Sequence, residues 1–204
     1  TPVLAEDSGS PLFENLVPVE DRQVGMAYID PEADFSVFKR VQLLDTYVAF
    51  RSGWRRDQNR GTRGVGVTSG DMDRIKADVS TLFNEVLAER LQVNDGYEIV
   101  EESGDDVLLI RAAIIDLDVT APDTRGAGRS RTYTAEPGEA TLYIELFDSV
   151  SGQILGRAAD RQVVRNSSGW VTWTNRVTNT QDARRMFSGW ADQLRSFLDS
   201  HYSD

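Results

Sequence analysis

Two aspartates near the middle of the chain have the spacing of a carboxylate pair. The segment IIDLDV places Asp116 and Asp118 two residues apart. In a β-strand this spacing puts both side chains on one face, about 6–7 Å apart. Together with Glu145, such a pair could bind a metal ion or provide the acid and base of glycan hydrolysis. The simpler interpretation is that the strand leaves the core here, so that both aspartates lie on its solvent-exposed face.

Other catalytic patterns are weaker still. The single histidine, His201, lies close to the end of the chain, where a side chain is not held rigidly enough for a catalytic triad. The segment GTRGVGVTSG lacks the Gly-Lys-Ser/Thr ending of a phosphate-binding loop, and its glycines match a dinucleotide fingerprint only loosely. The absence of cysteine excludes thiolate nucleophiles and Cys-ligated metal centres. The sequence therefore predicts a protein that is not an enzyme, with no metal and no cofactor.

Two segments rich in arginine or tryptophan are better candidates for binding. RSGWRRDQNRGTR also contains Arg51 and Arg63, and RNSSGWVTWTNRVTNT contains two tryptophans. Guanidinium groups and indole rings together can pair with and stack on an anionic or sugar ligand. The candidate binding residues are Trp54, Arg55, Arg56, Arg60, Trp170 and Trp173. The alternative is that the tryptophans fold back as caps on the core and the arginines pair with the protein's own carboxylates.

Two amphipathic helices are expected to support these segments. Thr68 or Ser69 can cap the first helix, which ends at the turn NDG, and its apolar residues recur three or four apart. They are Met72, Ile75, Val79, Leu82, Phe83, Val86, Leu87 and Leu91. The second helix, TQDARRMFSGWADQLRSFLDSHY, has a similar stripe. It consists of Ala183, Met186, Phe187, Trp190, Leu194, Phe197 and Leu198.

The remaining patterns predict strands. One is expected over residues 40–50, and GYEIVEESGDDVLLIRAAIIDLDV and TLYIELFDSVSGQILGRAADRQVV each indicate two strands that form a hairpin. In the second hairpin Asp148 can accept from turn amides, and Gly152 can adopt a positive φ. We therefore expect an α+β fold: a mainly antiparallel sheet of about five strands with two amphipathic helices packed on one face. Residues 1–23 are expected to be an extended N-terminal segment and residues 24–204 a single domain.

The overall charge restricts the class of partner. The chain has 204 residues and a formal net charge of -11. An acidic molecule of this kind repels phosphate backbones, so nucleic acid is not expected as a partner. No apolar run approaches the roughly 20 residues that cross a bilayer.

Three phrases resemble a known family. They are YIDPEADFSVFKRVQL, GEATLYIELFDSVSGQILG and MFSGWADQLRSFLD. Together they resemble an uncharacterised family of Gram-negative bacterial envelope lipoproteins, a domain of unknown function of about 200 residues, over about residues 12–200. The resemblance implies an exported protein on the periplasmic side of the envelope, attached through a lipid-bearing cysteine ahead of Thr1, in either membrane. It implies no catalytic residues.

The patterns and the resemblance together favour a binding or assembly module. We expect a protein or glycan partner in the envelope, with the arginine and tryptophan segments as the contact edge. A carboxylate-dependent periplasmic hydrolase and a spacer without a dedicated site are the alternatives. The oligomeric state stays open.

Overall fold

A computed structural model describes most of the chain. It covers residues 15–19, 25–60, 66–119, 139–163 and 176–201. Trp170, Trp173 and Arg63 lie outside these ranges, so their predicted roles remain predictions. In the part that is described, no helix is long and apolar enough to cross a membrane.

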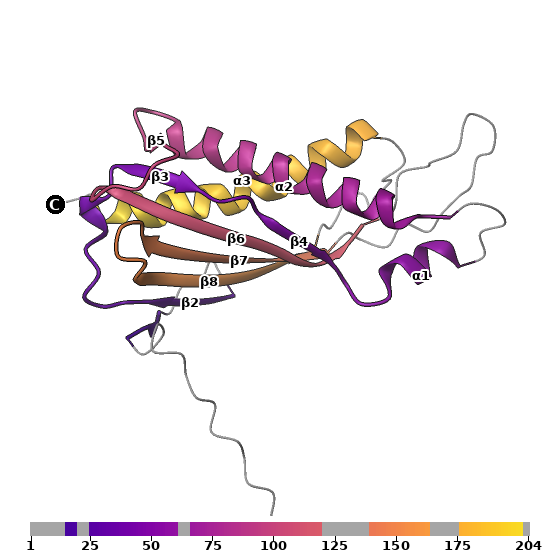
Figure 1. Ribbon diagram of the computed structural model, residues 1–204, viewed down its shortest axis with the longest axis horizontal. Coiled ribbons are helices and arrows are strands. Elements are labelled where there is room, and N and C mark those ends of the chain that lie inside the picture. Colours follow the sequence, from indigo (N-terminus) through magenta and orange to yellow (C-terminus); the bar gives the residue numbers. More distant parts are fainter. Residues whose placement is uncertain (1–14, 20–24, 61–65, 120–138, 164–175, 202–204) are drawn as a thin grey trace, which may run out of the picture.

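The described residues form one sheet and three α-helices (Figure 1). The strands are β1 (Val17–Val19), β2 (Met26–Ile29), β3 (Arg40–Leu43), β4 (Tyr47–Phe50), β5 (Glu98–Ile99), β6 (Val107–Asp118), β7 (Glu139–Asp148) and β8 (Ile154–Val163). The helices are α1 (Trp54–Asn59), α2 (Ser69–Gln92) and α3 (Arg176–Ser200), and a 3-10 turn spans Phe35–Val37.

The sheet is mixed. Its strand order is β1-β2-β8-β7-β6-β3-β5, and β4 also pairs with β6. The pairs β1–β2, β2–β8, β8–β7 and β7–β6 are antiparallel, whereas β3 and β4 run parallel to β6 and β5 runs parallel to β3. The α+β class is confirmed, but the prediction of about five strands in a mainly antiparallel sheet is wrong. The expected hairpin between residues 96 and 119 does not form, because β5 pairs with β3 and not with β6.

The strand predicted over residues 40–50 is interrupted. It is divided into β3 and β4 by residues 44–46, where Thr46 is buried and donates to Asn84 Oδ1 on α2 at 2.5 Å. The break changes which residues face the core. Val41 and Val48 are buried, whereas Tyr47, which a regular strand would place on the face of Val41, is 65% exposed.

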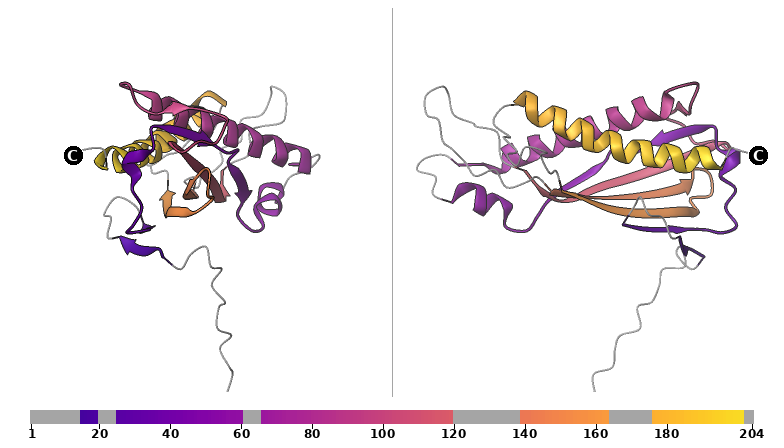
Figure 2. Two further views of the ribbon diagram at one scale, coloured as in Figure 1. Left: turned by 60° about the vertical axis from the view of Figure 1, so that its left-hand side comes forward. Right: turned by 180° about the vertical axis from the view of Figure 1, so that it is seen from behind.

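The two long helices confirm their predictions. Thr68 caps α2 in a capping box, with its Oγ1 accepting from Asp71 N and Asp71 Oδ2 accepting from Thr68 N. The helices α2 and α3 lie side by side on one face of the sheet (Figures 1 and 2). Their rings meet there: Phe83 contacts Phe187 at 5.2 Å between centroids. The short helix α1 was not predicted and lies apart from this layer (Figure 1).

The hairpin β7–β8 also forms as expected. Asp148 Oδ1 accepts from Val150 N at 2.9 Å and from Ser151 N at 2.7 Å. Gly152 has a φ of 70°, which a glycine adopts without strain. The hydrogen bonds from Ser151 and Val150 lower the pKa of Asp148. The turn residues and the two long strands therefore favour the same hairpin.

Candidate functional site

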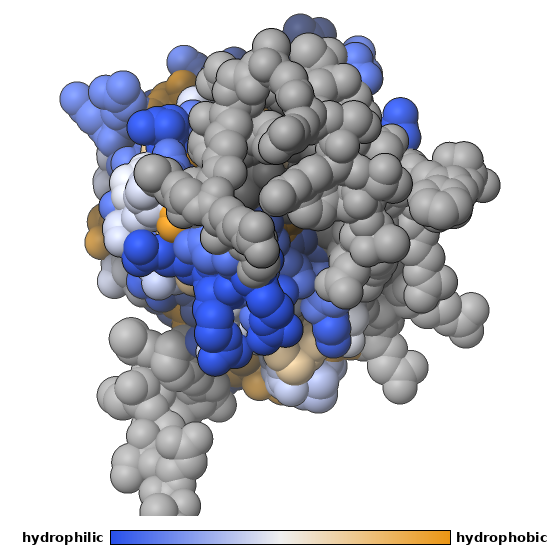
Figure 3. Space-filling view, turned by 90° about the vertical axis from the view of Figure 1, so that its right-hand side faces the viewer, coloured by the Kyte–Doolittle hydropathy of each residue, from blue (hydrophilic) through white to orange (hydrophobic). Residues whose placement is uncertain are grey.

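A hollow opens beside α1. The helix α1 lies at the end of the molecule opposite to the C-terminal end of α3 (Figure 1). The hollow has a volume of about 270 Å³ and lies between the end of β4, the start of α1 and the first turns of α2. Its cationic lining residues are Arg51, Arg55, Arg56 and Lys76, and Ala49, Phe50, Trp54 and Met72 supply the apolar part. We call it the arginine hollow. Seen from this end, hydrophilic side chains gather on the described surface (Figure 3).

Trp54 fixes α1 to the sheet. Its side chain is 1% exposed, its ring stacks on Phe50 with 3.9 Å between centroids, and its Nε1 donates to the carbonyl of Val119 at 2.7 Å. Trp54 is thus not an exposed stacking surface for a ligand, and for this residue the core-cap interpretation is correct. The physical reason is that the indole can bury its ring against Phe50 while its single N–H still finds a partner.

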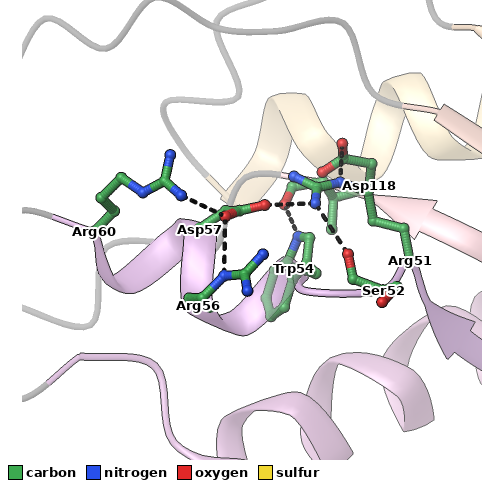
Figure 4. A network of polar contacts seen from close by, with 8 residues as sticks. Arg51, Ser52, Trp54, Arg56, Asp57, Arg60 and Asp118 are labelled. Carbon is green, nitrogen blue, oxygen red and sulfur yellow. Dashed lines mark hydrogen bonds and ion pairs between the residues drawn. The ribbon is translucent and has the colours of Figure 1, made fainter.

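Arg51 joins three parts of the chain. Its Nε donates to Asp118 Oδ2 at 2.5 Å and its Nη1 to Asp57 Oδ2 at 2.7 Å (Figure 4). These hydrogen bonds, to Asp57 first and then to Asp118, raise the pKa of Arg51. In return, the hydrogen bond from Arg51 lowers the pKa of Asp57. The charge of Arg51 is therefore used inside the protein, where it ties α1 to the end of β6.

Arg55 has a second positioning role. Its Nε donates to the carbonyl of Val67 at 3.1 Å and its Nη1 to Ser69 Oγ at 3.0 Å. Asn59 makes a reciprocal pair with Val67, donating from Nδ2 at 3.1 Å and accepting from the amide at 2.6 Å. These bonds hold α1 against the beginning of α2 and so form one wall of the hollow. Among the described carboxylates, none forms an ion pair with Arg55.

Three further cations lie in the open. The side chains of Arg56 and Arg60 are 78% and 77% exposed and share Asp57 at 3.7 and 3.5 Å. Lys76 is 38% exposed and lies 3.8 Å from Asp73. Contacts this long between exposed groups are weak and leave the cations able to exchange partners. Arg56 lines the hollow from α1 and Lys76 lines it from α2, so the hollow offers two cations to an anionic group.

The sequence indicated part of this site and missed the rest. It singled out Arg55, Arg56 and Arg60, which the structure brings together on α1 and its end. It gave no indication of Met72 and Lys76, because nothing local shows that the first turns of α2 lie beside β4. The spacing of Asp118 suggests either a catalytic carboxylate or the exposed end of a strand, whereas in the structure Asp118 is a counter-charge for Arg51.

The three candidate catalytic carboxylates do not converge. Asp116 is an exposed residue with a φ of 52°, at a bulge that shifts the register of β6 with β7. Asp118 is paired with Arg51, while Glu145 on β7 forms ion pairs with Arg111 and Arg157. Asp118 is opposite Glu139, six residues from Glu145, which corresponds to roughly 20 Å along the strand. Glu145 therefore cannot act with the aspartates on one bond.

Metal-ligating side chains and His201 are the other candidates for chemistry. No group of three or more His, Asp or Glu side chains among the described residues is arranged to hold a metal ion. His201 is exposed at the end of α3, and its Nδ1 donates to the carbonyl of Phe197 at 2.8 Å. Its ring also lies 5.2 Å from the ring of Phe35. These contacts hold the His201 side chain against the C-terminal end of α3.

Comparison with protein families gives one match. The family described as Protein of unknown function (DUF3313) matches residues 6–194. No curated protein matches the chain. The match covers the sheet, the arginine hollow and both long helices apart from the last six residues of α3.

Several solved structures are similar over most of the chain at low identity. PelC from Paraburkholderia phytofirmans, solved as a dodecamer, is 11% identical with a TM-score of 0.40, covering 81% of this chain and 98% of that one. A Xanthomonas campestris protein of the DUF330 family is also 11% identical, with a TM-score of 0.44 and coverages of 79% and 84%. A hypothetical protein from Chlamydia trachomatis is 9% identical, with a TM-score of 0.39 and coverages of 78% and 98%. Likeness at this level assigns no function.

Proposed function

Because the chain belongs to the DUF3313 family of proteins of unknown function, we propose a role for it from its own site: a non-catalytic binding module of the bacterial envelope. The arginine hollow is the binding site, and its ligand is an anionic group of a protein or glycan partner. The resemblance to envelope lipoproteins supports a periplasmic location and a lipid anchor.

The observation that carries the proposal is the gathering of cations in an acidic protein. The chain has a net charge of -11, yet at and beside the hollow four cations (Arg51, Arg56, Arg60 and Lys76) share three carboxylates, and Arg55 pairs with none of the described carboxylates. At physiological ionic strength charges are screened over about 8 Å. A ligand carboxylate inside the hollow therefore interacts with these cations more than with the distant acidic surface.

The chemistry of the hollow favours carboxylate-bearing ligands. Arg56 can form two parallel hydrogen bonds with a planar carboxylate, and Lys76 adds a second charge from α2. Arg51 and Trp54 hold the floor in place by contacts within the protein. The described lining is thus suited to holding an anionic group.

The test uses two defined probes, an oligogalacturonate and a glutamate-rich peptide, and a double variant, Arg56→Gln with Lys76→Gln. We expect at least one probe to bind and the double variant to bind it about tenfold more weakly, since two charge contacts of about 0.7 kcal/mol each are lost. Fluorescence anisotropy at low and at physiological ionic strength measures the affinity.

The matched control is Arg74→Gln with Arg90→Gln. These residues lie on α2 outside the hollow and also contact one carboxylate each, at 3.4 and 3.7 Å. The control removes the same net charge, so it should reduce affinity only slightly. Equal losses in the two double variants would show general electrostatic attraction, and the hollow would then not be the binding site.

A further inference from the structure

The sheet has a second face that α2 and α3 leave uncovered (Figures 1 and 2). Along β6 and β7 the residues that pack into the core alternate with residues that point to this other face, which we call the outer face. Its largest apolar side chains are exposed: Tyr47 at 65%, Met26 at 42% and Tyr143 at 38%. Exposed apolar side chains gathered on one face are typical of a surface that another molecule covers.

The apolar residues of the outer face form one row across five strands. Each is the cross-strand partner of the next, in the order Tyr47, Ala113, Tyr143, Ala159 and Met26. Large and small side chains therefore alternate along the row. A row with the same alternation, displaced by one strand, would place its large side chains on these alanines.

A charged row lies beside the apolar one, two residues away along the strands. It consists of Tyr28, Arg157, Glu145 and Arg111. Glu145 forms ion pairs with Arg111 at 2.6 Å and with Arg157 at 3.1 Å. Two copies of a chain with a net charge of -11 repel each other in general. On this row the charges alternate in sign, so a second copy can be attracted instead.

We infer that the outer face binds a second copy of this chain, about a two-fold axis that runs parallel to the strands between β7 and β8. With this axis β7 of one copy faces β8 of the other, and β6 faces β2. Tyr143 then packs on Ala159 of the second copy, and Met26 packs on its Ala113. Each contact joins a large side chain to a small one.

The charged row fits the same axis. Glu145 faces Arg157 of the second copy, and Arg157 faces its Glu145. Arg111 faces Tyr28 of the second copy, where a guanidinium group can lie over the ring. Both rows are thus self-complementary about one axis, which favours a second copy over an unrelated protein. Two sheets can pack face to face in this way about 10 Å apart.

The size of the patch sets the expected strength. Five strands about 4.8 Å apart span about 19 Å. A contact of this width is small for a permanent dimer, so we expect one that dissociates at roughly micromolar concentrations. Sedimentation equilibrium of the full chain from about 1 to 500 µM, at physiological ionic strength, measures the association.

The decisive variants are Glu145→Arg and Arg157→Glu. In a dimer of either variant, like charges meet at two places, so each variant alone should associate at least about tenfold more weakly than the parent. In an equimolar mixture the two changed side chains face each other with opposite charges. Association should then return to within about threefold of the parent. The ion pair between these two positions inside each chain stays lost in the mixture, so recovery reports a contact between copies.

The matched controls are Glu85→Arg and Arg184→Glu. These residues lie on α2 and α3, are in contact at 3.4 Å and are removed from the outer face. They change the net charge by the same amounts and should associate like the parent, alone and mixed. Equal losses in the controls would show an effect of net charge and overturn the inference.

The other outcomes are equally decisive. A parent that stays monomeric at every concentration overturns the inference and leaves the outer face to a different protein. Single variants that associate like the parent would place the contact elsewhere. A mixture as weak as its two components would exclude the two-fold axis between β7 and β8.

Discussion

Asp57 is the residue that determines which arginines are available to a ligand. It accepts from Arg51 Nη1 at 2.7 Å, and Arg56 and Arg60 lie 3.7 and 3.5 Å from its other oxygen. The contacts of all three arginines with Asp57 are drawn in Figure 4. The short contact fixes Arg51, whereas the longer contacts of the exposed Arg56 and Arg60 are weak and can be exchanged for contacts with a ligand. One carboxylate therefore both anchors α1 and keeps two cations near the hollow.

We predict that Asp57→Asn destabilises the protein at neutral pH but not in strong acid. The hydrogen bond from Arg51 lowers the pKa of Asp57 in the folded state. Its contribution is thus fully present above the unfolded pKa of about 3.9, and it is lost as the pH falls through the lowered folded value. Urea unfolding of both proteins across this range should show a difference that disappears at the acid end.

The control for this prediction is Asp192→Asn. Asp192 is an exposed acid on α3 whose contact with Arg90 is 3.7 Å long. Its variant should match the parent protein at every pH. A difference between parent and Asp57→Asn that persists in acid would mean that the aspartate acts through packing, not through its charge.

The residue types of the site could be predicted from the sequence. Which of these residues make contacts within the protein and which face a ligand could not. A cluster of arginines around a tryptophan is visible in the sequence, and so is the choice between a binding surface and core packing. Deciding that Trp54 is buried requires Phe50 and the carbonyl of Val119. Deciding that Arg51 is neutralised requires Asp118, which is 67 residues away.

At the scale of elements, the hairpin of β7 and β8 contains two glycines in contrasting positions, one in β8 and one in the turn. Gly156 is buried in β8, and an added Cβ would lie at 3.5–3.9 Å from Tyr28, Leu146 and Phe35, in ordinary contact. It borders an apolar groove of about 100 Å³ between α3 and β8. Gly152 has open space around it but a φ of 70°.

We predict opposite effects of the same substitution at these two glycines. Gly156→Ala should raise the free energy of unfolding by about 0.5–1 kcal/mol, since it reduces the freedom of the unfolded chain and adds a methyl group beside the groove. Gly152→Ala should lower it by about 1–2 kcal/mol, because the left-handed conformation strains a residue with a Cβ. Urea denaturation measures both, and a destabilised Gly156→Ala would show that β8 needs its flexibility there.

Which elements could be predicted depends on their length. The helices α2 and α3 and the hairpin β7–β8 repeat their pattern often enough to define a period. The strand β5 has two residues and α1 has six with one buried side chain, so neither shows a period. The parallel pairing of β3 and β4 with β6 joins residues that are far apart in the sequence, so no local pattern predicts it.

For the whole molecule, the position of the core sets β1 apart from the other strands. The hydrophobic core joins α2 and α3 to one face of the sheet, and its buried residues begin at Phe35. In β1 all three residues are exposed, and the strand pairs with β2 alone. The described structure thus gives β1 little part in the core.

We predict that a chain of residues 24–204 folds as the full chain does. Removing β1 eliminates three residue pairs with β2 and should lower the free energy of unfolding by at most about 2 kcal/mol, with the urea m-value nearly unchanged. A chain of residues 1–175 is the contrasting truncation, because it loses Phe187, Trp190, Leu194 and Leu198 from the core. That chain should show no cooperative unfolding, since the apolar face of α2 and the sheet would be open to water. Loss of cooperative unfolding in the chain of residues 24–204 would instead make the N-terminal segment part of the folding unit.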